Sequence, residues 1–171
     1  MEHQEFLRTV AEVAITLTGF TGIVAAFKMG NITWTKRTLT QFGVLVRSTV
    51  SACLMSFVPY LLSLFIESEN VVWQIATGVL GSIITINLFW FKGQFAGLQV
   101  ASIHKALYVG GLLVIAALLL SAIGVLQANK IFLIGIFWQL FIGVNNFVLL
   151  VRSDIQQLQS DEEIAGAEES N

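Results

Sequence analysis

Three polar side chains stand in stretches of the sequence that are otherwise apolar. Glu12 lies in "TVAEVAITLTGFTGIVAAF", residues 9–27, and Gln139 and Asn146 lie in "FWQLFIGVNNFVLLV", residues 137–151. An ionised carboxylate near the centre of a bilayer costs roughly 2.5 kcal/mol or more, so carboxylates at that depth commonly face a polar interior. Glu12 could therefore be a proton or cation site inside a helical bundle.

A second interpretation of Glu12 needs no ion pathway. Arg8 precedes it by four residues, and residues four apart are neighbours on one face of a helix. If the helix enters the membrane near Val10, Glu12 lies close to the outer interface and pairs with Arg8. The sequence alone leaves both interpretations open.

Gln139 and Asn146 raise the same question with neutral groups. Together with Gly143 they share one face of a helix, whereas Asn145 points elsewhere. Amides buried in a membrane need hydrogen-bond partners, and they commonly find them on neighbouring helices. We interpret both residues either as contacts that hold helices or subunits together, or as the polar lining of a pore.

The run "AEV" at residues 11–13, followed by Thr16, resembles the first helix of the small multidrug resistance transporters. This resemblance implies that Glu12 is the shared site for protons and cationic substrates. It covers fewer than ten residues. The chain departs from that family in its length, in a fifth apolar stretch and in lacking the family's W-S-G-x-G run.

The composition indicates a membrane protein. Of 171 residues, 56% are hydrophobic and 12% are charged, against about 45–50% and about 25% in soluble domains. A helix needs roughly 20 apolar residues to cross a hydrocarbon core of about 30 Å. The candidate spans are residues 8–27, 46–66, 71–91, 106–126 and 131–151.

The predicted fold is an all-α, polytopic bundle of five transmembrane helices, or of four helices plus an interfacial N-terminal helix. Residues 1–152 form this domain, with longer basic links at residues 28–45 and 92–105. Residues 153–171 are acidic and polar, so we expect them to be a disordered cytoplasmic tail.

Lysine and arginine residues set the expected orientation, because they gather on the cytoplasmic side. With five spans, seven of the nine fall on one side, and that arrangement puts the N-terminus outside and the C-terminus in the cytoplasm. The seven are Lys28, Lys36, Arg37, Arg47, Lys92, Lys105 and Arg152, against Arg8 and Lys130. The host membrane is expected to be the plasma or inner membrane.

Small residues recur at helical spacing on several spans and predict close helix packing. The glycines that we assign to such contacts are Gly22, Gly78, Gly81 and Gly143. The sequence gives little support for a catalytic or ligand-binding site beyond the residues named above. We expect no catalytic residues, no cofactor, no metal site and no nucleic-acid partner, because the two histidines lie outside the spans and the single cysteine, Cys53, has no second thiol to pair with.

Three classes of function remain. The sequence favours a small integral membrane protein that works as a homo-oligomer, either a pore or a scaffold. The alternatives are a small proton-coupled transporter that uses Glu12 and an accessory subunit that binds another membrane protein.

Overall fold

A computed structural model describes residues 2–29, 36–95 and 102–169 of the chain, with side chains described within 5–23, 38–90 and 106–152. The described residues form five α-helices and short connections between them, without a strand. The predicted all-α bundle is therefore confirmed.

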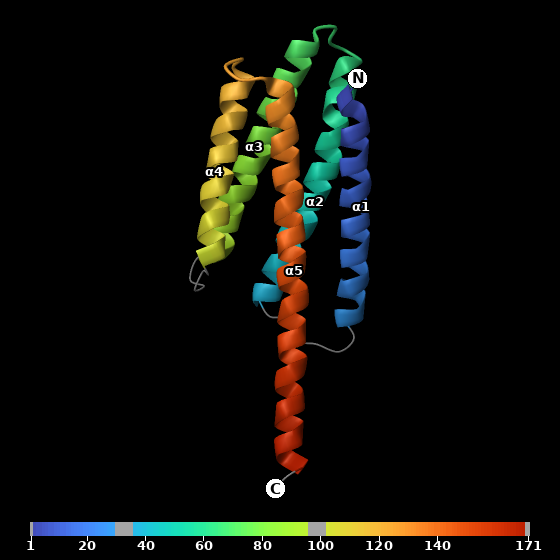
Figure 1. The fold of residues 1–171 in the computed structure, drawn as a ribbon, viewed down its shortest axis with the longest axis vertical. Coiled ribbons are helices and arrows are strands. Elements are labelled where there is room, and N and C mark those ends of the chain that lie inside the picture. The colour runs from blue at the N-terminus through green and yellow to red at the C-terminus, as the bar shows by residue number, and fades with distance from the viewer. Residues whose placement is uncertain (1, 30–35, 96–101, 170–171) are drawn as a thin grey trace.

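The helices run alternately up and down (Figure 1). The N-terminus and the connections from α2 to α3 and from α4 to α5 lie at the upper end, and α5 continues far below the others. Their bounds are α1 Glu2–Met29, α2 Lys36–Ser63, α3 Glu69–Phe95, α4 Ser102–Ala122 and α5 Ala128–Glu169.

Four helices are long and apolar enough to cross a membrane. Their apolar parts are Glu5–Ile23, Thr38–Ser63, Glu69–Trp90 and Ala128–Arg152. The fifth, in α4, is the shorter stretch Ala106–Ala122. The bundle therefore has the dimensions and composition of a polytopic membrane protein.

The second span begins earlier than the sequence predicts. We expected residues 28–45 to link two spans, but α1 continues to Met29 and α2 begins at Lys36. Within this part of α2, Thr38, Thr40 and Gln41 are buried. Their polarity suggested an aqueous link, whereas the structure turns them toward neighbouring helices, where polar groups are shielded from lipid.

The fourth span ends earlier than the predicted 106–126, because α4 stops at Ala122 and a turn follows. Gly124 has a φ of 82°, a left-handed conformation that glycine adopts without a steric penalty. Its N–H donates to Ser121 O at 3.0 Å, and the N–H of Val125 donates to Leu120 O at 3.0 Å. This pair of bonds is a Schellman cap, which terminates the helix.

Helix α5 is longer than expected. It has 42 residues and continues through residues 153–169, where the sequence predicts a disordered tail. This segment contains no proline, and it is rich in Glu and Gln, which favour helix. Extending an existing helix also avoids the cost of nucleation. At 1.5 Å per residue, α5 is about 63 Å long.

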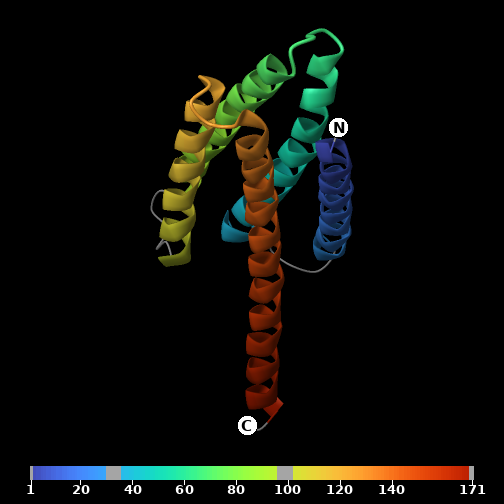
Figure 2. The ribbon, with the colours of Figure 1, turned by 45° about the horizontal axis from the view of Figure 1, so that its top comes forward.

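The core lies where α5 packs across the other helices. Helix α5 makes its most extensive contact with α2, and α3 and α4 pair on one side while α1 packs mainly on α2 at the other (Figure 2). Ala14, Ala52 and Ala76 are fully buried, which allows helix backbones to approach closely. Trp73 of α3 meets Phe132 of α5 edge to face, with ring centroids 5.6 Å apart.

Candidate functional site

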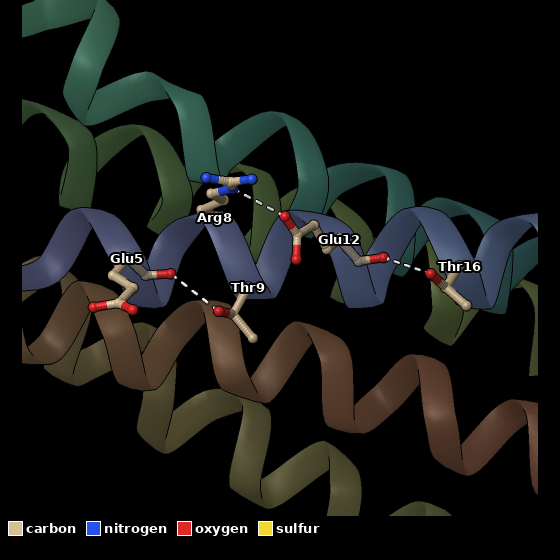
Figure 3. A network of polar contacts seen from close by, with 5 residues as sticks. All are labelled: Glu5, Arg8, Thr9, Glu12 and Thr16. Carbon is tan, nitrogen blue, oxygen red and sulfur yellow. Dashed lines mark hydrogen bonds and ion pairs between the residues drawn. The ribbon is translucent and has the colours of Figure 1, made fainter.

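Glu12 lies on the outward face of α1 (Figure 3). Its Oε1 accepts from Nε of Arg8 at 3.0 Å, and the two side chains are 63% and 82% exposed. The i,i+4 ion pair expected from the sequence is thus present. A carboxylate so exposed does not face the interior of this bundle, so the position that the transporter resemblance implies for Glu12 has no support within one chain.

Threonine hydroxyls on the same face are satisfied by their own helix. Thr9 donates to Glu5 O at 3.1 Å and Thr16 donates to Glu12 O at 2.8 Å (Figure 3). Such bonds to the preceding turn let a hydroxyl lie in an apolar helix without another partner. The outward face of α1 therefore combines one exposed ion pair and internally satisfied threonines with exposed apolar side chains such as Ile15 and Ile23.

Gln139 and Asn146 are buried within the chain, each 2% exposed. Gln139 donates through Nε2 to Ser51 Oγ of α2 at 3.5 Å, which is a long hydrogen bond. Asn146 donates through Nδ2 to Ile142 O of its own helix at 2.8 Å, but its Oδ1 is buried without a hydrogen-bond partner. A buried acceptor left unpaired costs about 1–3 kcal/mol.

Both amides border the same internal cavity. Gln139 and Asn146 line a cavity of about 60 Å³ between α2, α3, α4 and α5. One water needs roughly 10–15 Å³ of such space, so a few waters or one small polar group would fit. The other polar members of the lining are Arg47, Ser48, Asn87, Trp90, Tyr108 and Trp138. No carboxylate lines the pocket, so its one formal charge is positive.

Arg47 supplies that charge from within the apolar part of α2. Its guanidinium lies over the ring of Trp90, 5.1 Å from the centroid, which is a cation–π contact. Among the described residues no acidic group pairs with it. Sequence reasoning assigned Arg47 to the cytoplasmic surface and missed its role in the pocket, because its neighbour Trp90 is 43 residues away in the sequence.

Trp138 forms one wall of the pocket. Gly110 and Gly111 on α4 leave the room for its indole, since a Cβ at Gly110 would overlap the ring and one at Gly111 would lie 3.9 Å from Nε1. The indole N–H is buried without a partner. The signal in the sequence was a tryptophan deep in a span, away from the interfaces where tryptophan is enriched.

Three of the four packing glycines lie at helix contacts within the chain. A Cβ at Gly143 would lie 2.7 Å from Thr49 Cγ2, one at Gly81 3.3 Å from Leu118 Cβ, and one at Gly78 3.6 Å from Ala122 Cβ. The fourth, Gly22, is exposed and has nothing within 4 Å of an added Cβ, and Gly19 is equally open. Among the described residues, Gly22 therefore makes no close helix contact.

The arrangement is suited to binding a small polar group. The pocket offers hydrogen-bond donors, an acceptor and a cation, with apolar walls. Within the described ranges, no cluster of His, Cys, Asp and Glu could hold a metal ion.

Comparison of the chain with known protein families, curated proteins and solved structures finds no match. The class of the protein therefore follows from its own features: a small helical bundle with four helices of membrane-spanning length and a pocket that Arg47, Gln139 and Asn146 help to line.

Proposed function

We propose that the protein acts as a homo-oligomeric membrane scaffold, with α1 at the contact between copies. The observation that carries this proposal is the outward face of α1. Within an apolar helix, this face presents the Arg8–Glu12 ion pair together with Gly19 and Gly22, for which no described residue lies within 4 Å of an added Cβ.

Such a face is poorly matched to lipid. Exposed charges in an apolar helix are costly, whereas glycines allow a second helix to approach closely enough for packing and hydrogen bonding. A second helix that covers this face would shield the charges from lipid and pack closely against the glycines. Helix α1 is also the helix at the edge of the bundle, where a second copy has access (Figure 1).

Charge complementarity favours a second copy as the occupant. A two-fold contact brings one surface against itself, so the surface must be self-complementary. Arg8 and Glu12 lie one helical turn apart, and in a parallel pair of α1 helices the Arg8 of each copy can reach the Glu12 of the other.

The pore form of this hypothesis needs Gln139 and Asn146 on a surface between copies. Both are buried inside one chain, which supports the scaffold form better than a pore lined by these residues. We accordingly propose the scaffold as the function. A measurable ion conductance of the purified protein in lipid bilayers would support the pore instead.

The orientation proposed with it puts the N-terminus outside and the C-terminus in the cytoplasm. The alternating direction of the five helices supports it, because the end of α1, the start of α2, the end of α3 and the start of α4 lie at one end of the bundle (Figure 1). These helix ends adjoin the basic links of the sequence, so that end is the one expected in the cytoplasm. A reporter fused at each terminus would test the orientation.

Site-directed cross-linking tests the contact. In a Cys53→Ala background, Gly19→Cys should form cross-linked dimers in native membranes on mild oxidation. Leu113→Cys is the matched control, since Leu113 is 68% exposed on α4, away from α1. Gly19→Leu should convert the dimer to a monomer in nanodiscs without loss of fold, because the site is open.

Two results would reject the scaffold. The first is a monomeric native mass together with no cross-link from Gly19→Cys. The second is a cross-link to a different protein in place of a second copy, which would support an accessory subunit instead.

A further inference from the structure

Beyond the contact between copies, a second surface joins the polar pocket. An apolar groove of about 540 Å³ runs between α2 and α3, lined on α2 from Phe42 to Met55 and on α3 by Ile83, Ile86 and Asn87. Arg47 and Asn87 line both the groove and the pocket. The two spaces are therefore adjacent, and Arg47 lies where they meet.

We propose that pocket and groove together bind one anionic phospholipid whose headgroup carries hydroxyls, such as phosphatidylglycerol. Its phosphate lies at Arg47, its headgroup hydroxyls enter the pocket, and one acyl chain lies in the groove.

The charge of the site selects an anion. Arg47 contacts Trp90, the last residue of the apolar part of α3, so it lies at the level where that part ends. A cation at that level needs a counter-charge, and lipid phosphates are found there. Because no acid among the described residues pairs with it and no carboxylate lines either space, a phosphate is the matching partner.

The hydrogen-bonding groups select a hydroxyl. Asn146 is 2% exposed, its amide N–H is taken by Ile142 O, and its Oδ1 has no partner. A ligand that only accepts hydrogen bonds would leave this oxygen unpaired. The indole N–H of Trp138 is likewise unpaired and needs an acceptor. A hydroxyl serves both, because it donates and accepts.

The groove favours a lipid over a free anion. From Arg47 to Met55 the α2 wall rises by eight residues, or about 12 Å at 1.5 Å per residue. One leaflet of the hydrocarbon core is about 15 Å thick, so the groove accommodates most of an acyl chain in one leaflet. Its outer residues Val50, Leu54 and Ile86 are exposed, as a lipid-facing surface requires.

The junction is built by close packing. A Cβ at Gly43 would lie 3.6 Å from the Trp90 ring, so the absence of a larger side chain there lets Trp90 approach α2. The ring then lies under the Arg47 guanidinium and restrains it at the mouth of the pocket. Restraining the cation before the ligand arrives lowers the ordering cost of binding.

Native mass spectrometry of the purified full chain tests the site. The protein is titrated with phosphatidylglycerol and with phosphatidylcholine that carries the same acyl chains. We expect a preference for phosphatidylglycerol that Arg47→Gln lowers by about tenfold or more. Arg8→Gln is the matched control for the loss of an arginine and should leave the preference unchanged.

A second pair of variants tests the pocket. Asn146→Leu should weaken retention of phosphatidylglycerol, whereas Asn145→Leu, which removes an adjacent amide outside the pocket lining, should not. Arg47→Lys keeps the charge and should retain part of the preference. If Arg47→Gln does not fold, the lipid preference of Arg47→Lys serves as the test of this arginine.

Three outcomes would overturn the proposal. Equal retention of the two lipids excludes recognition of the headgroup. An unchanged preference in Arg47→Lys, Arg47→Gln and Asn146→Leu excludes this pocket. Binding of soluble glycerol 3-phosphate as tightly as the lipid excludes a role for the groove, and with it the lipid as the ligand.

Discussion

Substituting Gly143 with alanine tests how closely α1, α2 and α5 pack. The added Cβ would lie 2.7 Å from Thr49 Cγ2, 3.2 Å from Ser48 Oγ and 3.6 Å from Leu17 Cδ2. Thr49 is β-branched and fully buried, so it has little freedom to move. Overpacking of this kind costs about 1–3 kcal/mol.

The helix itself gains from the same change. Replacing glycine by alanine inside a helix stabilises it by about 1 kcal/mol. We therefore expect Gly143→Ala to change the free energy of unfolding by about 0–2 kcal/mol in the destabilising direction. Gly78→Ala is the matched control, since its Cβ would meet Ala122 Cβ at an ordinary 3.6 Å and only the gain in helix stability should remain.

The assay is equilibrium unfolding in mild detergent by titration with SDS, followed by circular dichroism. A double-mutant cycle with Thr49→Ser isolates the contact, because serine lacks Cγ2 but keeps the hydroxyl that lies 2.8 Å from Thr18 Oγ1. Thr49→Ser should recover most of the loss caused by Gly143→Ala. If Gly143→Ala is as stable as Gly78→Ala and the cycle shows no coupling, the inference that Gly143 packs closely against Thr49 is wrong.

Two further substitutions test other parts of the structure. Gln139→Leu should change the free energy of unfolding by less than about 1 kcal/mol, because the hydrogen bond from Gln139 to Ser51 is long. A much larger loss of unfolding free energy in the same SDS titration would contradict this weak structural role. Gly124→Ala should destabilise the chain by about 1 kcal/mol, since alanine is strained at a φ of 82° and its Cβ would lie 2.9 Å from Gln74 Nε2. Unchanged thermal stability of Gly124→Ala would contradict the Schellman cap.

The sequence predicted the architecture because lipid leaves few alternatives. Runs of about 20 apolar residues in a chain with few charges must be helical, since backbone groups have no other partners in a bilayer. The ends of the helices were harder to predict. Residues 38–45 contain enough polar side chains to suggest a link, and only the burial of Thr38, Thr40 and Gln41 indicates that they belong to a span.

The site was predicted in part. The i,i+4 spacing of Arg8 and Glu12 indicated their ion pair, because that contact is local to one helix. The sequence also singled out Gln139 and Asn146 as buried amides. The pocket they share with Arg47 depends on how four helices pack, and no spacing along the chain encodes the approach of Trp90 to Arg47.

The length of α5 separates the charges of the protein in space. Beyond Asp154, the acidic residues of α5 begin at Asp161, which follows Arg152 by nine residues along one helix, or about 14 Å. The Debye length at physiological ionic strength is about 8 Å, so the acidic residues from Asp161 onward are largely screened from the basic end of the bundle. In the proposed orientation, an anionic membrane therefore meets a locally cationic surface, although the whole chain has a formal net charge of -2.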